Sequence, residues 1–252
     1  MVAKEKIKRN FSRYAAYYDE YCSVQDHCGR GLIAKAGVEN FGKILDIGCG
    51  TGNYTKLLRE RFGSAVIKAV DISAEMVATA RGKSAGQRIE FIVADAETAQ
   101  FGEKFELVTS NACFQWFDDL EKSLGRYKNI LDKNGIILFS IFGPSTLYEL
   151  AEAMGESLSC GSFVGAETIK QMLEKYFADV SVTEEMLKET YSRLWELLRT
   201  IKYTGTGGGT NGRIISRGQI KRLEQVYKEK FGDITATYQV FYCRAKRKDR
   251  TS

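Results

Sequence analysis

The sequence predicts an α/β protein with one mostly parallel sheet of seven strands and helices on both faces. Short β-branched runs alternate with helical patterns in the first half of the chain, as in consecutive βαβ units. The fifth run, 135–142, is apolar almost throughout, which is typical of a strand buried on both faces. The 252 residues, 44% of them apolar, suffice for one large domain. Because no repeat or low-complexity linker divides the chain, we predict a single domain over 1–252.

The hydrophobic patterns place the elements in order along the chain. Strands are predicted at Lys43–Ile47, Ala65–Val70, Ile89–Ala94, Phe105–Ser110, Gly135–Phe142, Val180–Thr190 and Ile234–Arg244. Helices are predicted at Tyr54–Arg61, after Ser73 (with Met76, Val77 and Ala80 on it), and at Leu120–Leu131, Leu147–Leu173, Leu194–Lys202 and Gln219–Phe231. Ser73 is a favourable N-cap. The run Gly205–Gly212 holds too many glycines to keep one shape by itself.

Composition excludes several classes of protein. No apolar run is long enough to cross a membrane, and the charged N-terminus does not resemble a secretion signal. Six scattered cysteines without a C-x-x-C pair favour reduced thiols and a cytoplasmic location. The single histidine, His27, argues against a Ser-His-Asp hydrolase and against multi-histidine sites, so no metal is predicted. A net charge of +5 favours an acidic partner only weakly, because a basic tail supplies much of it.

The strongest local signal is the segment Ile44–Asn53, where an apolar strand ends in three glycines at alternate positions. Gly48, Gly50 and Gly52 let the backbone turn sharply and leave room for a ligand against the main chain. The helix that follows directs its first amide N–H groups at such a ligand. A dinucleotide fingerprint would place its third glycine at Asn53, so NAD is disfavoured. A plain tight turn is the alternative.

Acidic residues end the next two predicted strands. Asp71 lies about twenty residues beyond the glycines, where a carboxylate can accept hydrogen bonds from both ribose hydroxyls; a helix-start acid is the alternative. Asp95, followed by Ala96 and Glu97, could accept a hydrogen bond from an adenine amino group, or cap a helix. Three such signals at the carboxyl ends of successive strands favour a ligand site at that edge of the sheet.

With these motifs, the chain resembles the class I S-adenosylmethionine methyltransferases, which have a Rossmann-like sheet. Further segments resemble the malonyl-acyl-carrier-protein O-methyltransferase family of biotin synthesis. They are Ile7–Ser12, Ala15-Ala16, Tyr18-Asp19, Val24-Gln25, Asp95–Glu97, Ser110–Trp116, Phe139–Ser140, Gly143–Leu150 and Ile201–Gly205. The chain departs from the family pattern at turns, with Ala99-Gln100 in place of Leu-Pro and Asn134-Gly135-Ile136 in place of Pro-Gly-Gly. The run Gly207–Asn211 is also unusual for that family.

The resemblance implies S-adenosyl-L-methionine as the cofactor and malonyl-acyl carrier protein as the substrate, methylated on its free carboxylate. It implies an N-terminal helical lid over 1–40 and a helical insertion with substrate-side elements over 147–215. The cofactor-binding residues it implies are Gln25, Gly48, Cys49, Gly50, Gly52, Asp71, Ile72, Met76, Asp95, Ala96, Glu97, Asn111 and Ala112. The candidate substrate-binding residues are Tyr18, Gln115, Trp116, Thr146, Arg199 and Lys202.

This reaction suits a chain with one histidine. A carboxylate is already ionised near neutral pH, so it needs no general base, and positioning of the reactants supplies most of the acceleration. Tyr14 and Tyr18 are predicted on one face of an N-terminal helix, with Tyr14 as packing and Tyr18 as a donor to the substrate carboxylate. Tyr18 and Trp116 as plain core residues are the alternatives.

Arg193, Arg199 and Lys202 are predicted near one another on the Leu194–Lys202 helix, as contacts for an acidic carrier protein or for the substrate carboxylate. A solvated helix face is the alternative. Another small carboxylic acid or other nucleophile could be the methyl acceptor, and a non-catalytic cofactor-binding module is a second rival. A nucleic-acid methyltransferase is disfavoured, because Asn111 is followed by Ala112 and Cys113 rather than by prolines.

Overall fold

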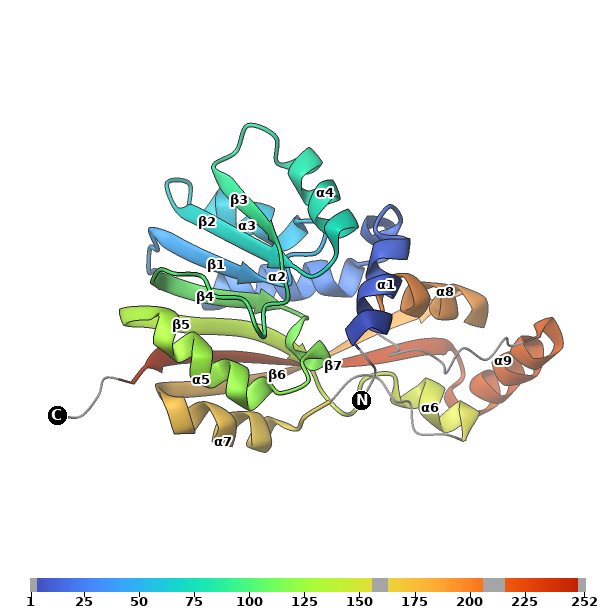
Figure 1. Ribbon diagram of the computed structural model, residues 1–252. Coiled ribbons are helices and arrows are strands. Elements are labelled where there is room, and N and C mark those ends of the chain that lie inside the picture. Colours follow the sequence, from blue (N-terminus) through green and yellow to red (C-terminus); the bar gives the residue numbers. More distant parts are fainter. Residues whose placement is uncertain (1–3, 156–162, 206–215, 249–252) are drawn as a thin grey trace.

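One sheet of seven strands runs through the molecule. The computed structural model describes residues 4–155, 163–205 and 216–248, and within them the strands lie in the order β3-β2-β1-β4-β5-β7-β6 (Figure 1). The strands are β1 (Lys43–Ile47), β2 (Val66–Asp71), β3 (Ile89–Val93), β4 (Phe105–Asn111), β5 (Leu131–Phe142), β6 (Phe177–Tyr191) and β7 (Ile234–Arg247). Strands β1 to β5 are parallel, and β7 pairs antiparallel with both β5 and β6. The predicted Rossmann-like, mostly parallel sheet is confirmed.

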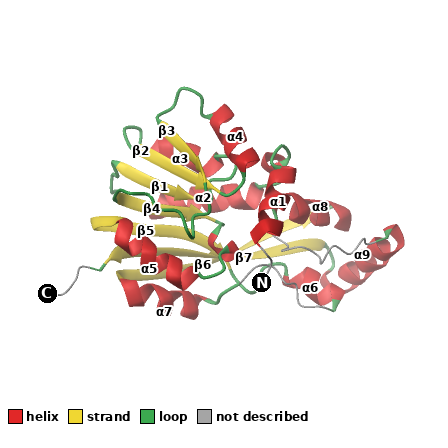
Figure 2. Cartoon of the chain, in the orientation of Figure 1, coloured by secondary structure: helices red, strands yellow, loops and turns green. Residues whose placement is uncertain are grey.

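Helices cover both faces of this sheet (Figure 2). They are α1 (Lys4–Tyr14), α2 (Ser23–Lys35), α3 (Asn53–Arg61), α4 (Ala74–Lys83), α5 (Leu120–Ile130), α6 (Tyr148–Met154), α7 (Ala166–Tyr176), α8 (Leu194–Thr204) and α9 (Arg217–Phe231), with short 3₁₀ turns η1 (Tyr18–Glu20) and η2 (Phe114–Trp116). One hydrophobic cluster joins α2, α3, α6, α8 and α9 to the sheet. A second cluster joins α5 and α7 to the opposite face.

Strand β1 shows why the central strands are apolar. Ile44 belongs to the first cluster, whereas Leu45 and Ile47 belong to the second, and all three are fully buried. Successive side chains of a strand point to opposite faces, so a strand covered by helices on both sides needs apolar residues at odd and even positions alike. The C-terminal end of β1 therefore enters the glycine loop from a rigid, fully packed layer.

The second half of the chain departs from the predicted boundaries. Strand β5 begins at Leu131, four residues before the predicted Gly135, because Leu131 pairs with Phe105 of β4. The helix predicted over Leu147–Leu173 is not continuous: α6 ends before Gly155, which adopts a left-handed conformation, and α7 begins at Ala166. Residues 156–162 and the run Gly207–Asn211 lie outside the described residues. The region after β5 contains the strand β6 as well as helices.

The N-terminal segment differs from its prediction in one important way. Helix α1 ends at Tyr14, and Tyr18 begins the separate turn η1, so Tyr14 and Tyr18 do not share a helix face. The chain turns between them, with the Tyr17 N–H donating to the Tyr14 carbonyl at 2.9 Å. Tyr14 packs edge-to-face against Tyr203 of α8 with ring centres 5.0 Å apart, as a packing residue would. Within the described residues, no helix has the length and hydropathy needed to span a membrane.

Candidate cofactor pocket

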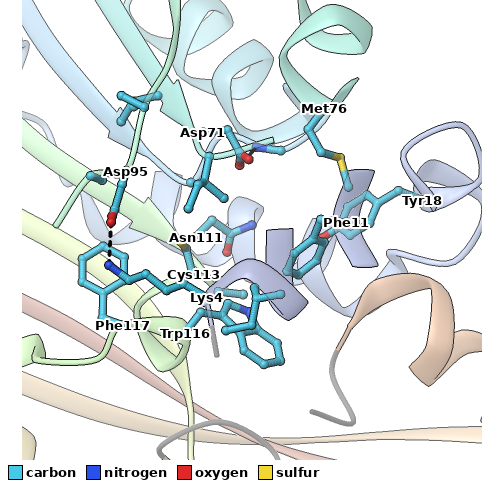
Figure 3. Close-up of a pocket in the computed structure, with 18 residues that line it drawn as sticks. Lys4, Phe11, Tyr18, Asp71, Met76, Asp95, Asn111, Cys113, Trp116 and Phe117 are labelled. Carbon is cyan, nitrogen blue, oxygen red and sulfur yellow. Dashed lines mark hydrogen bonds and ion pairs between the residues drawn. The ribbon is translucent and has the colours of Figure 1, made fainter. Parts of the chain in front are cut away.

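A pocket with an empty volume of about 740 Å³, its open mouth included, lies where β1 to β4 end. Two sets of residues line it (Figure 3). We call Gly48, Gly50, Asp71, Asp95 and Asn111 the sheet wall, and Lys4, Ile7, Phe11 and Tyr18, from α1 and η1, the N-terminal wall. Ile72, Met76, Ala96, Ala112, Trp116 and Phe117 are among the other lining residues.

The glycine loop needs its glycines for two different reasons. Gly48 has φ +71, and a Cβ there would lie 2.2 Å from the Cys113 sulfur, so both conformation and close packing exclude a side chain. Gly52 has φ +86 and packs against Ala80 of α4 in the same way. Gly50 has φ +53, but a Cβ there would meet no atom within 4 Å. Since Gly50 also lines the pocket, its bare backbone fits a cradle for a ligand lying against the main chain.

Asp71, at the end of β2, is tied to the loop by its carboxylate. One oxygen accepts the Gly50 N–H at 2.9 Å, and the other accepts the Ser73 N–H at 2.8 Å. Burial raises the pKa of Asp71 above its ordinary value, and these backbone hydrogen bonds oppose the rise. Each carboxylate oxygen keeps a further lone pair for a hydroxyl donor in the pocket. Ser73 caps α4 through the Met76 N–H, as the sequence predicts.

Asp95 and Glu97, just after β3, meet a cation from the N-terminal wall. The Lys4 ammonium lies 2.7 Å from Asp95 Oδ2 (Figure 3). It also pairs with Glu97. Asp95 Oδ1 accepts the Glu97 N–H at 3.0 Å, while Glu97 accepts the backbone N–H groups of Asp118 and Asp119 at 3.0 and 2.9 Å. Asp95 lines the pocket, whereas Glu97 holds the start of α5 and is not a lining residue.

Asn111 ends β4 and connects three elements. Its amide donates to the Gln25 carbonyl of α2 at 2.8 Å, and its oxygen accepts the Ser140 hydroxyl of β5 at 2.7 Å. The same Ser140 oxygen accepts the Ala112 N–H at 2.9 Å. These hydrogen bonds hold Asn111 and Ala112 in place, and both residues line the pocket.

Aromatic rings line the pocket on its N-terminal side. Phe11 packs edge-to-face on Trp116 at 5.8 Å between ring centres and contacts Tyr18 at 6.4 Å. Burial raises the pKa of Tyr18 well above its ordinary value, and the nearby charges of Cys22, Asp26, Asp71 and Asp19 raise it further. The Tyr18 phenol is therefore protonated at neutral pH and available as a hydrogen-bond donor.

The pocket gathers nine of the thirteen predicted cofactor residues and two of the six substrate residues. The nine are Gly48, Gly50, Asp71, Ile72, Met76, Asp95, Ala96, Asn111 and Ala112, and the two are Tyr18 and Trp116.

The other four cofactor candidates support the pocket from outside. Gln25 is buried and accepts from Asn111 through its backbone carbonyl. Cys49 and Gly52 are buried in the loop after β1, on the side that faces α4. Glu97 supports Asp95 by donating its N–H to the Asp95 carboxylate.

The remaining substrate candidates point elsewhere. The buried Gln115 turns back to donate to the Ala112 carbonyl at 2.7 Å. Thr146 is also buried, and its hydroxyl exchanges hydrogen bonds of 3.2 Å with the Gln239 backbone of β7. Arg199 and Lys202 are exposed on α8, where they lie over the rings of Tyr21, Tyr203 and Tyr14. Arg193 precedes α8 and pairs with Glu224 at 3.0 Å, so it does not join them.

Sequence reasoning missed seven lining residues, which are Lys4, Ile7, Phe11, Val70, Ala94, Cys113 and Phe117. For Lys4 a signal existed, because Lys4, Ile7 and Phe11 recur at the spacing of one helix face. Cys113 and Phe117 lie in a loop whose path the pattern of hydrophobic residues does not define.

Comparisons with known proteins identify the family of this chain. Residues 45–139 match the model of the methyltransferase domain family. Malonyl-[acyl-carrier protein] O-methyltransferase 1 of Ilyobacter polytropus is 34% identical over 240 residues, covering 92% of this chain and 90% of the relative. The enzyme of that name from Acetivibrio thermocellus is 31% identical and covers 98% and 95%. The chain belongs to the malonyl-[acyl-carrier protein] O-methyltransferase family.

Solved structures share the fold of this O-methyltransferase family member at lower identity. The YcgJ protein of Bacillus subtilis superposes with a TM-score of 0.64 at 17% identity, covering 88% of this chain and 99% of that one. Phosphoethanolamine N-methyltransferase 2 of Haemonchus contortus, in complex with S-adenosyl-L-methionine, gives 0.57 at 21% identity, covering 87% and 52%. In this chain, the matched segment 45–139 runs from within β1 to within β5 and contains the whole sheet wall.

Proposed function

We propose that this protein uses S-adenosyl-L-methionine to methylate the free carboxylate of a malonyl thioester on acyl carrier protein. The product would be the malonyl methyl ester that primes pimeloyl synthesis for biotin. The observation that carries the proposal is the length of the similarity. It covers 92% of the chain in one relative and 98% in another, well beyond the matched segment 45–139 that contains the sheet wall.

The sheet wall fits this cofactor. The backbone of Gly48 and Gly50 would hold its amino-acid part, Asp71 its ribose hydroxyls, and Asp95 with Ala96 its adenine. Ile72 and Met76 add apolar surface beside Asp71, as a largely apolar pocket with few polar groups requires. When bound, the cofactor supplies an electrophilic methyl group on a sulfonium centre.

The methyl acceptor has to be bound and oriented, but it needs no chemical activation. A malonyl carboxylate is ionised at neutral pH, so no residue has to remove a proton from it. Tyr18, kept protonated by its raised pKa, and the indole of Trp116 can donate hydrogen bonds to it. Phe11 packs beside both and excludes water, which strengthens those donors. Positioning of the reactants is then the main contribution of the protein.

The exposed cations of α8 suit an acidic carrier protein. Arg199 and Lys202 lie over the rings of Tyr21, Tyr203 and Tyr14, which hold their charged groups at the surface. The helix that bears them contacts α1, which lines the pocket. By the same reasoning we propose the described parts of 1–40 as a lid and those of 147–215 as substrate-side elements, because α1 lines the pocket and α8 contacts α1.

The test is methyl transfer from labelled cofactor to malonyl-acyl carrier protein, malonyl-CoA and free malonate. We expect the carrier-protein thioester to be the best acceptor and free malonate a poor one. Arg199→Glu with Lys202→Glu should raise KM about tenfold for the carrier protein and less than twofold for malonyl-CoA. The control is Lys170→Glu, an exposed charge on α7, which should change neither value.

Other outcomes would choose among the rivals. Transfer to a different carboxylic acid or nucleophile, with none to malonyl compounds, would replace the substrate and keep the methyltransferase. Tight cofactor binding without turnover on any acceptor would favour a non-catalytic binding module.

A further inference from the structure

We propose that Lys4 is a cofactor-positioning residue, which locks α1 over the adenine end of the pocket and must release its carboxylates before the cofactor can exchange. The inference rests on the cofactor of the proposed function, but not on the identity of the methyl acceptor.

The ion pairs of Lys4 are partly buried. The exposed fractions of the side chains are 24% for Lys4, 29% for Asp95 and 8% for Glu97. Burial lowers the pKa of Lys4, but hydrogen bonds and charges from both carboxylates outweigh it and leave the pKa raised. Pairs in such surroundings are screened by salt less than exposed pairs are.

Backbone hydrogen bonds hold the two carboxylates in place independently of Lys4. Glu97 is fixed by two backbone N–H groups before α5, and Asp95 by the Glu97 N–H. Their remaining acceptor capacity faces Lys4, and in the case of Asp95 the pocket. Among the described residues that line the pocket, Lys4 alone carries a positive charge.

The position of Lys4 on α1 links this charge to the pocket. Lys4, Ile7 and Phe11 lie on one face of the helix, and all three line the pocket. The ion pairs therefore fix the first turn of α1, while Ser12 ties its last turn to Ser73 at 2.9 Å. On this proposal a ligand beneath this face leaves when α1 lifts, and lifting breaks the pairs of Lys4.

The experiment measures dissociation of S-adenosylhomocysteine, the demethylated cofactor, from the full chain by stopped-flow fluorescence. Lys4→Met should speed dissociation about tenfold and weaken equilibrium binding by a similar factor. Lys4→Arg keeps the charge and should restore most of the wild-type rate. The matched control is Lys6→Met, which removes an exposed charge from the same helix and should change nothing.

Salt provides a second readout that a merely structural role would not give. Raising the ionic strength from about 0.05 M to about 0.5 M should speed dissociation from the wild type by about twofold, a modest factor because the ion pairs are partly buried, and should not change the rate of Lys4→Met. Lys4→Met with the kinetics of Lys6→Met, or with tighter binding than the wild type, would overturn the inference. Failure of the wild type to bind S-adenosylhomocysteine at all would overturn the proposed function as well, so the two failures are distinguishable.

Discussion

The two walls of the pocket are held by different kinds of bond. In the sheet wall, backbone groups fix the loops: the N–H groups of Gly48 and Cys49 both donate to the Val70 carbonyl, at 2.8 and 3.0 Å. In the N-terminal wall, the contacts join side chains of distant segments. Asp19, beside Tyr18, accepts the Thr51 hydroxyl at 2.5 Å and pairs with Lys83 at 2.7 Å.

This difference indicates a division of labour. The sheet wall is continuous with buried strands, so it is rigid and suits recognition of a common cofactor. The N-terminal wall is attached by a few polar contacts and ring packing, so it can open at modest cost and suits entry and release. Substitutions in the sheet wall should therefore affect cofactor binding most, and those in the N-terminal wall should affect exchange and acceptor use.

The largest expected effect belongs to Gly50→Ala. A methyl group there would enter the ligand cradle, and φ +53 is unfavourable for alanine. We expect S-adenosylhomocysteine binding to weaken about 100-fold, roughly 2.7 kcal/mol, as measured by calorimetry.

Gly86→Ala is the matched control for Gly50→Ala. Gly86 has φ +79, and a Cβ added there would meet equally open space, but this residue does not line the pocket. Both variants should lose about 1 kcal/mol of stability from backbone strain, and only Gly50→Ala should lose binding. Equal binding by the two variants would mean that the loop does not approach the ligand.

The sheet wall could be predicted from sequence because the topology of a parallel sheet determines which residues meet. Parallel strands bring their carboxyl ends to one edge, so Gly50, Asp71 and Asp95 meet once the strands are recognised. The strands can be recognised from their hydrophobic pattern without any knowledge of distant contacts.

The N-terminal wall could not be predicted in the same way. The turn after Tyr14 leaves the Tyr14 ring packed against α8 and the Tyr18 side chain in the pocket. This turn depends on packing against Tyr203, which is far away in the sequence. Lys4 likewise reaches Asp95 across 91 positions of the chain. For Gln115 and Thr146, residue type suggested a donor, but the backbone carbonyl groups around them take those donors.

A second prediction concerns Asp46, which supports the sheet wall from beneath. Asp46 is fully buried at the end of β1, with one oxygen accepting the Thr55 hydroxyl at 2.6 Å and the other without a partner among the described residues. Burial raises its pKa to about 7, the charge of Asp71 adds to the rise, and the Thr55 hydrogen bond opposes it.

Because the folded protein binds this proton more tightly than the unfolded chain, stability should fall as pH rises from about 4 to about 7 and then level off. We expect Asp46→Asn to remove about 2 kcal/mol of this loss between about pH 5 and pH 7, measured by urea unfolding. Thr55→Val leaves the carboxyl in place and should retain the pH dependence. Parallel pH profiles for the wild type and Asp46→Asn would show that Asp46 keeps an ordinary pKa.

The smallest expected effect tests the acceptor side of the N-terminal wall. Tyr18→Phe removes only a hydroxyl, so the ring packing with Phe11 remains, and binding of S-adenosylhomocysteine should change less than twofold. If the hydroxyl donates to the acceptor carboxylate, KM for malonyl-acyl carrier protein should rise about five- to tenfold, in line with one hydrogen bond to a charged group. Tyr14→Phe, which alters a ring packed on α8 outside the pocket, should leave KM unchanged. A loss of cofactor affinity in Tyr18→Phe, with KM unaffected, would instead mean that Tyr18 binds the cofactor, as the sheet wall does. The boundary between the two roles would then lie within η1.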